Sequence, residues 1–183
     1  MFELAKLICL VVYNMLRGFI MKLRFGKGSK IHWLQRISPF CSLNIYGKGN
    51  LVIGRNCQFP AGCDLTVLGN GRLVLGERVI MNKYCVLSAH CSIEIGDNCL
   101  IGPGVKIFDN YHRFSKEHGA KQELSVAPIK IGKNCWLGSN AVILKGTNIG
   151  DNCVIGAGCV VKGTIPSCSI VRPNINNIIE EIR

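Results

Sequence analysis

The sequence has few charged residues and few prolines. Only 18% of its 183 residues are charged and 48% are hydrophobic, which excludes an intrinsically disordered chain. Six prolines stand against 21 glycines, a balance that favours frequent tight turns over a flexible linker. A chain of this length can bury the core of one domain.

Signals for secretion or membrane spanning are also missing. The apolar run at 7–16 is too short to span a bilayer comfortably, lies between Lys6 and Arg17, and is followed by no cleavage site of small residues. The 11 cysteines include no C-x-x-C pair, which argues against a metal site, and no metal is expected. We therefore expect a cytoplasmic protein with reduced thiols.

Acidic residues are scarce, and the positive charge is uneven. The formal net charge is +11, and residues 1–36 contain seven Lys or Arg but only one acidic residue, Glu3. A basic N-terminus of this kind suits nucleic acid, anionic lipid or an anionic substrate, or is simply a solvated face.

Residues 131–166 repeat with a period of six. The first position of each block is aliphatic and the fifth is mostly small, as in Cys135-Trp136-Leu137, where a fifth position precedes the next first position by two residues. Two residues apart, both side chains point to the same face of an extended strand. The next three residues, Gly138-Ser139-Asn140, suit a corner, because Gly and Asn tolerate positive φ.

Three such blocks, each a strand and a corner, close one triangular coil, and stacked coils bury the paired positions as one core. The same phase continues upstream with slips, from about residue 53. Because free cysteine behaves as a small buried apolar residue, we interpret the fifth-position cysteines as core residues. They are Cys57, Cys63, Cys85, Cys91, Cys99, Cys135, Cys153 and Cys159.

The two ends lie outside the repeat. Apolar residues at Leu4, Leu7, Ile8, Val11, Val12 and Met15 have helical spacing, which predicts an amphipathic helix over roughly 3–22. It either caps the first coil, whose edge would otherwise be open, or lies on a membrane surface. We divide the chain into an N-terminal segment (1–30), a β-helix (31–172) with an inserted loop (108–128), and a short C-terminal helix (173–183).

The repeat resembles that of the left-handed parallel β-helix acyltransferases, in particular the maltose/galactoside and capsular-polysaccharide O-acetyltransferases. The likeness covers about residues 50–175 and is closest over 95–166. It implies an all-β solenoid of left-handed hexapeptide coils, acetyl-CoA as co-substrate, and a homotrimer with its sites between subunits. It implies no nucleic-acid partner.

The resemblance also implies residue roles. In "IGPGVKIFDNYH", the histidine that matches the family's general base is His112, and in "MNKYC" the acceptor-positioning asparagine is Asn82. Capsule-type enzymes often have D-H-N-H where this chain has Asp109-Asn110-Tyr111-His112. Asp109, Tyr111 and Glu123 are the expected substrate contacts, and Glu123 is also a candidate to orient the imidazole.

The segment "NCWLGS" resembles the "NVWIGS" of the family, which places Trp136 on the wall of the acetyl-CoA channel. The turn after it offers backbone N–H groups for the thioester carbonyl. Basic residues near the end of the helix hold the CoA phosphates in the family. The cofactor-binding residues implied here are Trp136, Gly138, Ser139, Ala157, Lys162 and Arg172.

Together these residues predict direct transfer of an acetyl group from acetyl-CoA to a hydroxyl of a sugar or polysaccharide intermediate. A neutral imidazole takes the hydroxyl proton, and backbone donors meet the developing oxyanion, so no Ser or Cys nucleophile is needed. The basic N-terminus favours an acceptor on a lipid carrier or growing polysaccharide, and a location at the inner face of a membrane.

Three alternatives remain. An antibiotic or another small molecule would serve as acceptor on the same site. A metal enzyme like the γ-class carbonic anhydrases would use His90, His112 and His118. A non-catalytic solenoid scaffold would act through its basic, apolar N-terminus.

Overall fold

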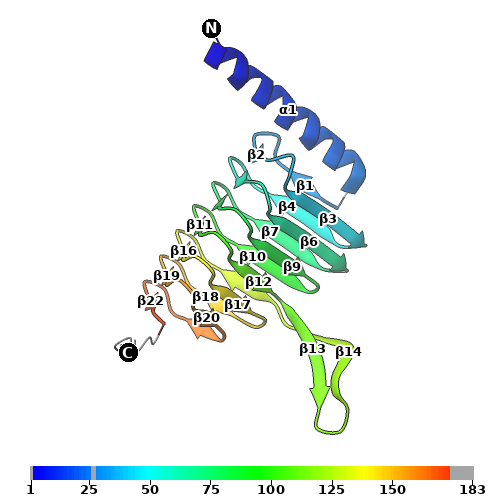
Figure 1. The fold of residues 1–183 in the computed structure, drawn as a ribbon, viewed down its shortest axis with the longest axis vertical. Coiled ribbons are helices and arrows are strands. Elements are labelled where there is room, and N and C mark those ends of the chain that lie inside the picture. Colours follow the sequence, from blue (N-terminus) through cyan, green and yellow to red (C-terminus); the bar gives the residue numbers. More distant parts are fainter. Residues whose placement is uncertain (1, 26–27, 174–183) are drawn as a thin grey trace, which may run out of the picture.

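The computed structural model describes residues 2–25 and 28–173. These residues form one helix, α1 (Phe2–Phe25), followed by a solenoid of short parallel strands (Figure 1). The prediction of an all-β solenoid is confirmed, and the fold is a left-handed parallel β-helix. The helix expected at 173–183 lies outside the described residues, apart from Pro173.

Three parallel sheets form the sides of the solenoid, and the coils add strands to sheets A, B and C in turn. Sheet A contains β1 (Lys30–Ile31), β4 (Asn50–Ile53), β7 (Arg72–Leu75), β10 (Ser92–Ile95), β15 (Ile129–Ile131), β18 (Asn148–Ile149) and β21 (Thr164–Ile165). Sheet B contains β2 (Arg36–Ile37), β5 (Gln58–Phe59), β8 (Ile80–Met81), β11 (Leu100–Ile101), β16 (Trp136–Leu137), β19 (Val154–Ile155) and β22 (Ile170–Val171). Sheet C contains β3 (Ser42–Gly47), β6 (Asp64–Gly69), β9 (Val86–Ala89), β12 (Lys106–Phe108), β17 (Val142–Leu144) and β20 (Val160–Val161). We call the edges between the sheets the A–B, B–C and C–A corners.

The first coils are longer than the strict repeat. Lys130 pairs with Asn148 of the next coil, a separation of three blocks, as the period of six requires. Lys30 pairs with Val52 of the next coil, which is a longer separation than three blocks. The slips in the upstream sequence therefore come from longer coils, with strands of six residues in β3 and β6.

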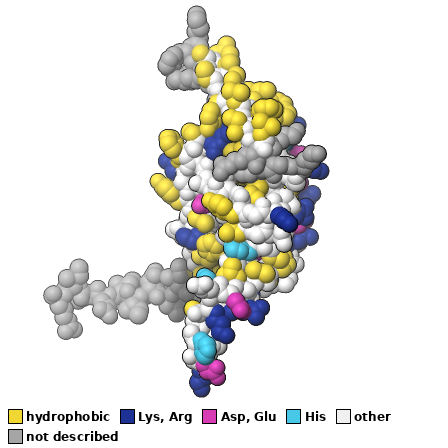
Figure 2. All heavy atoms as spheres, turned by 90° about the vertical axis from the view of Figure 1, so that its right-hand side faces the viewer, with side chains coloured by type: hydrophobic (Ala, Val, Ile, Leu, Met, Phe, Trp, Pro, Cys, Tyr) yellow, Lys and Arg dark blue, Asp and Glu magenta, His cyan; other side chains and the backbone are white. Residues whose placement is uncertain are grey.

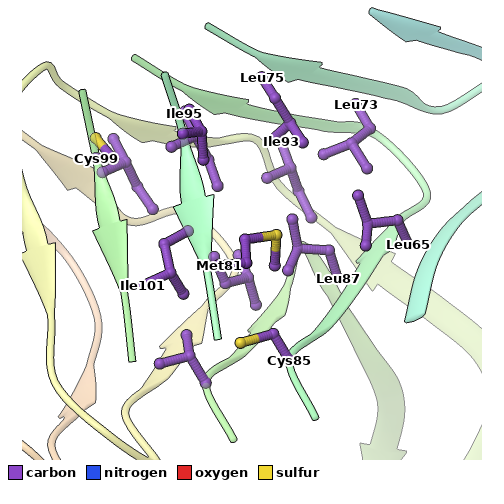
Figure 3. Close-up of a cluster of buried hydrophobic side chains, with 14 of the residues drawn as sticks. Leu65, Leu73, Leu75, Met81, Cys85, Leu87, Ile93, Ile95, Cys99 and Ile101 are labelled. Carbon is purple, nitrogen blue, oxygen red and sulfur yellow. The ribbon is translucent and has the colours of Figure 1, made fainter. Parts of the chain in front are cut away.

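Alternate residues of each strand point inward and build one continuous apolar core. Figure 3 shows side chains of successive coils stacked on one another, such as Leu73 and Ile93, which are paired across sheet A. Of the eight cysteines predicted to be buried, seven are buried and Cys91 is half-buried. Burial raises the pKa of the Cys57 thiol to about 11, so this thiol stays protonated and packs as a small apolar residue.

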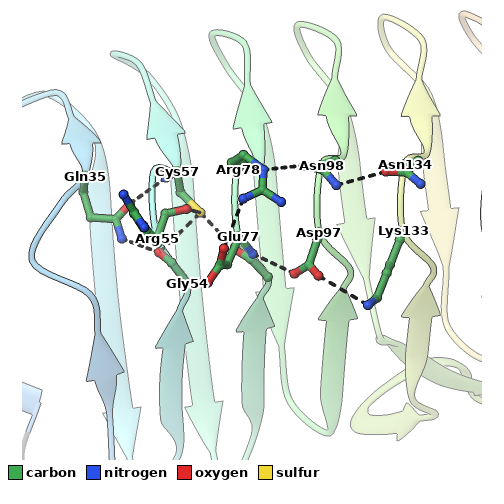
Figure 4. A network of polar contacts seen from close by, with 11 residues as sticks. Gln35, Gly54, Arg55, Cys57, Glu77, Arg78, Asp97, Asn98, Lys133 and Asn134 are labelled. Atoms are coloured by element: carbon green, nitrogen blue, oxygen red, sulfur yellow. Dashed lines mark hydrogen bonds and ion pairs between the residues drawn. The ribbon is translucent and has the colours of Figure 1, made fainter.

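Asparagines support the backbone at the A–B corner (Figure 4). Asn98, Asn134 and Asn152 have φ of 59°, 56° and 58°, a left-handed conformation that asparagine tolerates better than most residues. The Nδ2 of Asn98 donates to Oδ1 of Asn134 at 3.0 Å, and Asn134 donates likewise to Asn152 at 3.0 Å. At the B–C corner Asn140 has φ 58°, which confirms that the third corner residue adopts positive φ.

Helix α1 lies across the open end of the first coil, in the position that a cap would take (Figure 1). The contact is made by one side of the helix, where Asn14 and Met21 are buried. Asn14 Oδ1 accepts the N–H of Ile37 at 3.0 Å. Arg17 donates to the carbonyl oxygen of Cys41 at 2.7 Å and also to that of Ser38.

Two further buried polar side chains bond to the second coil. Ser29 Oγ accepts the N–H of Leu51 at 3.1 Å, and Gln35 Oε1 accepts the N–H of Cys57 at 2.9 Å. Together with Asn14, they satisfy backbone donors of the first two coils. Side-chain hydrogen bonds thus supplement the strand pairing at this end of the solenoid.

The described side chains of the predicted apolar stripe are exposed instead of buried against the solenoid. Leu4, Ile8, Val11, Val12 and Met15 are all exposed. The docked side is formed instead by Asn14, Arg17 and Met21, because the first coil presents unpaired backbone groups that polar side chains satisfy. Among the described residues, no helix has the length and apolarity needed to cross a bilayer.

We expect Asn14→Ala to lower the free energy of unfolding by about 1–3 kcal/mol, since it leaves the buried Ile37 N–H without its acceptor. Urea denaturation measures this loss. Val12→Ala on the exposed side of the same helix is the control and is expected to change stability by less than about 0.5 kcal/mol. Equal effects of the two substitutions would contradict the capping role of Asn14.

Candidate active site

Among the described residues, the coil is interrupted at the C–A corner after β12, within the segment 108–128 where the sequence analysis expects an inserted loop. The insertion is an antiparallel hairpin of β13 (Asn110–Ser115) and β14 (Gly119–Val126), not an irregular loop. The hairpin projects away from the stacked coils (Figure 1). At its base, the N–H of Ala127 donates to the carbonyl oxygen of Asp109 at 2.9 Å and closes the insertion.

Asp109 anchors the hairpin from inside the solenoid. Its side chain is fully buried, and its carboxylate oxygens accept the N–H of His90 at 2.9 Å and that of Cys91 at 2.6 Å. The Nδ2 of Asn110 lies 3.3 Å from the same carboxylate. With its oxygens used in this way, Asp109 is not open to a substrate in this conformation, and the structure gives it a positioning role in place of the predicted contact.

His112 lies on β13, opposite Leu124 of β14, and is exposed. Its Nδ1 is 2.8 Å from the carbonyl oxygen of Lys121. Because a carbonyl only accepts, this contact requires the hydrogen on Nδ1 and leaves the lone pair on Nε2. The backbone of β14 thus orients the imidazole, a role for which the sequence offered Glu123 as the candidate.

Glu123 itself is exposed, and its carboxylate lies 4.0 Å from Nε of Arg113. At that separation on the surface, the ion pair contributes little to stability. The predicted substrate contact of Glu123 remains a prediction.

Lys145 holds the hairpin against the next coil and was not found from the sequence. Its Nζ lies 3.9 Å from the centroid of the Tyr111 ring and donates to Ser125 Oγ. It therefore contacts one residue of each hairpin strand, and Tyr111 and Ser125 are paired across the ribbon. A lysine over an aromatic ring is a favourable cation–π contact, but no hydropathy pattern reveals it.

We expect Lys145→Met to increase hairpin opening and to lower turnover several-fold, because a cation–π contact and a hydrogen bond together contribute roughly 1–2 kcal/mol. Amide hydrogen exchange of residues 110–126 measures the opening, which should rise about tenfold. Lys130→Met, an exposed lysine on β15, is the matched control. Unchanged exchange in the first variant would rule out the clamp.

Sheet B carries an apolar row on its outer face. Trp136 is 54% exposed, while Cys135 and Leu137 on either side are buried, which confirms the predicted orientation. Its neighbours above and below in the sheet are apolar as well. A continuous row of partly exposed apolar side chains indicates a surface that another molecule covers. The row consists of Ile80, Leu100, Trp136, Val154 and Ile170.

The B–C corner follows this row and contains five predicted site residues. They are Asn82, Gly138, Ser139, Ala157 and Arg172, each just after a strand of sheet B. The Nδ2 of Asn82 donates to the carbonyl oxygen of Ile101 at 3.2 Å, so this side chain joins two coils. Positive φ is adopted by Tyr84, at 64°, and not by Asn82, so Asn82 is not the left-handed residue of this corner.

One predicted donor at this corner is not available. The N–H of Gly138 donates to the carbonyl oxygen of Ile155 at 2.7 Å as part of the ladder between coils, so it cannot also bind a thioester. The Ser139 N–H has no partner within the described residues. A Cβ on Gly138 would lie 2.5 Å from the backbone N of Ala157, which explains the glycine at this close approach.

The predicted residues thus lie at two different edges of the prism. Trp136 and the B–C corner residues form one group. Tyr111, His112 and Glu123 lie on the hairpin at the C–A corner, with Asp109 at its base, and Lys162 follows β20 at the same corner. Within one chain, sheet C separates the two groups, and the hairpin projects outward from its own coils.

The histidines of the metal alternative are dispersed. His90 lies at the C–A corner one coil before the hairpin, His112 lies within β13, and His118 lies in the hairpin turn. Among the described residues, no group of three His, Cys, Asp or Glu side chains lies close enough to hold a metal ion.

Comparison with known proteins agrees with this fold. The family model for the hexapeptide repeat of succinyl-transferase matches residues 85–108 and 128–162. In fold, the chain resembles AntD, an N-acyltransferase from Bacillus cereus in complex with dTDP and coenzyme A, with a TM-score of 0.65 and 20% identity over 87% of both chains.

Sequence relatives are acetyltransferases. The chain is 30% identical, over 69% of both chains, to the putative lipopolysaccharide biosynthesis O-acetyl transferase WbbJ of Escherichia coli. It is 41% identical to the galactoside O-acetyltransferase of the same organism over 50% of this chain and 45% of that protein. The chain spans about a third to a half of the length of the first relatives that it matches. By its repeat, its fold and these relatives, the chain belongs to the hexapeptide-repeat acetyltransferases.

Proposed function

We propose that this protein is an acetyl-CoA-dependent O-acetyltransferase that modifies a hydroxyl of a sugar or of a lipo- or capsular-polysaccharide intermediate. The observation that carries the proposal is the contact between Nδ1 of His112 and the Lys121 carbonyl oxygen. It holds an exposed imidazole on a projecting hairpin with Nε2 free to accept a proton, as a general base requires.

The reaction needs no covalent enzyme intermediate. Nε2 of His112 removes the acceptor hydroxyl proton while the hydroxyl oxygen attacks the thioester carbonyl. The Ser139 N–H is a donor for the developing oxyanion. When the tetrahedral intermediate collapses, the C–S bond breaks and the imidazolium returns its proton to the sulfur of CoA, so the products are the acetyl ester and free CoA.

Two copies of the chain are needed to build one site. The base lies on the hairpin at the C–A corner, whereas Trp136 and Ser139 lie on sheet B and at the B–C corner. We propose a homotrimer in which the projecting hairpin of one subunit covers the apolar row of its neighbour. Such packing would bury Trp136 and Leu100, which are about half exposed in the single chain.

Acetyl-CoA then binds along sheet B and the B–C corner. Trp136 offers an apolar wall, Ala157 a small exposed turn residue, and Arg172 an exposed positive charge. Lys162 lies at the other edge and would reach the same cofactor only from the neighbouring subunit. Asn82 and Tyr111 are left to position the acceptor.

The acceptor class is supported by the relatives. One is named a lipopolysaccharide biosynthesis O-acetyl transferase and another a galactoside O-acetyltransferase. A sugar of this kind that is attached to a lipid would be met at the inner face of a membrane, where we also place the enzyme through residues 1–30. An antibiotic-type acceptor remains the alternative.

The test is release of the CoA thiol from acetyl-CoA in the presence of sugars, amino sugars, glycolipid intermediates and chloramphenicol, each assayed separately. Release that depends on a hydroxylated sugar acceptor is expected. Release only with an amino sugar would show that the enzyme forms an amide and not an ester. No release with any acceptor, together with no CoA binding by calorimetry, would favour the scaffold alternative.

A further inference from the structure

The outer side of α1 is an exposed apolar surface. An α-helix advances about 100° per residue, so the exposed apolar residues spread over an arc of roughly 180°, centred about 180° from the docked residues Asn14, Arg17 and Met21. Figure 2 shows hydrophobic side chains gathered over this end of the molecule. The apolar residues are Leu4, Ile8, Val11, Val12, Met15, Leu16, Phe19, Ile20 and Leu23.

The first coil continues this surface with aromatic side chains. Trp33 is 55% exposed, Phe40 78% and Tyr46 60%, and all three belong to the coil that α1 covers. Trp33 lies at the A–B corner, Phe40 at the B–C corner and Tyr46 on β3. Exposed tryptophan and tyrosine at one end of a protein are characteristic of the boundary between water and lipid.

The same end is strongly basic, with Glu3 as the only acidic residue of the sequence before Asp64. Between residues 4 and 63 the sequence contains nine Lys or Arg and no Asp or Glu. Those whose side chains are described and exposed include Lys30, Arg36, Lys48 and Arg55. The nine are Lys6, Arg17, Lys22, Arg24, Lys27, Lys30, Arg36, Lys48 and Arg55.

A groove of about 500 Å³ opens between α1 and the first coils. Val11, Met15 and Trp33 form its apolar lining. Arg36 contributes positive charge, whereas the guanidinium of Arg78 lies 3.1 Å from a carboxylate oxygen of Glu77. This combination suits an amphiphile with an anionic head and an apolar tail.

We propose that α1 and the first coil form a docking surface for a bilayer that contains anionic lipid. The helix lies in the plane of the interface with its apolar arc among the upper acyl chains, because its other side is fixed to the solenoid through Asn14 and Arg17. The aromatic residues of the first coil lie at headgroup level, and the basic residues contact the anionic headgroups.

The positive charge of this surface favours lipid over a second copy of this chain as the occupant. A second copy would bring an identical basic surface, and like charges oppose that contact. An anionic bilayer attracts it instead, with each basic residue near the surface strengthening binding about fivefold. The inference deepens the membrane location proposed above by naming the contact residues and the lipid charge. It is tested without acetyl-CoA or acceptor, so its failure would remove that location and leave the proposed acetyl transfer untouched.

The test is co-sedimentation of the full chain with vesicles of phosphatidylcholine alone and of phosphatidylcholine with phosphatidylglycerol. We expect binding to the anionic vesicles that weakens as salt is raised, and little binding to the neutral ones. Leu16→Glu combined with Phe19→Glu is expected to weaken binding about tenfold or more, since both side chains lie in the apolar arc.

Val160→Glu is the matched control. Val160 is 68% exposed but lies on the last described strand of sheet C, far along the chain from α1. The Val160→Glu variant should bind vesicles as the wild type does. Circular dichroism verifies that each variant folds.

Three outcomes would overturn the proposal. They are equal binding to neutral and anionic vesicles, no binding to either, and unchanged binding of the double variant. Mass by light scattering is measured in parallel. If the wild type does not bind vesicles, and the oligomeric mass of the double variant differs from that of the wild type, the apolar arc is an interface between copies of this chain.

Discussion

Replacing His112 with alanine is expected to lower acetyl transfer by about 100- to 10,000-fold, the range typical of a lost general base. The imidazole lies on an exposed strand and is bonded only through Nδ1 to the Lys121 carbonyl oxygen, so its removal should leave the fold intact. CoA binding by calorimetry should be unchanged, because the proposed contacts to the cofactor do not include His112. Thiol release with the best acceptor of the panel measures the loss.

His118→Ala is the control for this variant. His118 is an exposed histidine in the turn of the same hairpin. The His118→Ala variant should therefore keep turnover within a few-fold of the wild type. Partial recovery of His112→Ala by added imidazole would identify the lost group as a base. Turnover of His112→Ala within tenfold of the wild type would remove His112 from the mechanism.

Replacing Asp109 with alanine should cause the largest loss of stability. The carboxylate is fully buried and accepts the N–H groups of His90 and Cys91. Hydrogen bonds of this kind contribute roughly 1.5–3 kcal/mol each, so we expect a loss of about 3–5 kcal/mol in the free energy of unfolding. The base of the hairpin loses its anchor at the same time, and turnover should fall although Asp109 reaches no substrate.

Chemical denaturation measures the first effect, and amide hydrogen exchange of residues 110–126 measures the second. Asp97→Ala is the control, since Asp97 also accepts a backbone N–H, that of Glu77 at 2.9 Å, but its side chain is 33% exposed. Its loss should be about 1 kcal/mol. Asp109→Asn keeps one acceptor oxygen and should fall between wild type and Asp109→Ala. A variant Asp109→Ala as stable as the control would refute the anchoring role.

The period of six in the sequence predicts the solenoid because burial in a stacked coil is a local property. Whether Cys135 and Leu137 point inward depends only on their spacing along one extended strand, and both are buried. The corner at Gly138-Ser139-Asn140 is local as well, and Asn140 has the positive φ expected there. The longer first coils make the period of six harder to recognise upstream, but alternate residues of their strands still point inward.

The candidate site was predicted only in part. The resemblance points to His112 and Trp136, and the structure places both on the surface. The resemblance could not reveal that the Lys121 carbonyl orients His112, because a backbone contact across a hairpin depends on the register of its two strands. Lys145 was missed for a similar reason, because it meets Tyr111 from the next coil, beyond the whole inserted hairpin in the sequence.

The sequence by itself determined which residues face the core, where the corners lie and where the coil is interrupted, because these depend on spacing within a few residues. Only the tertiary structure decided that Asp109 anchors the hairpin and that α1 docks through Asn14 and Arg17 with its apolar side outward. The reason is that unpaired backbone groups at a coil end or an insertion base select the side chains that satisfy them. Those groups become visible only once the coils are stacked.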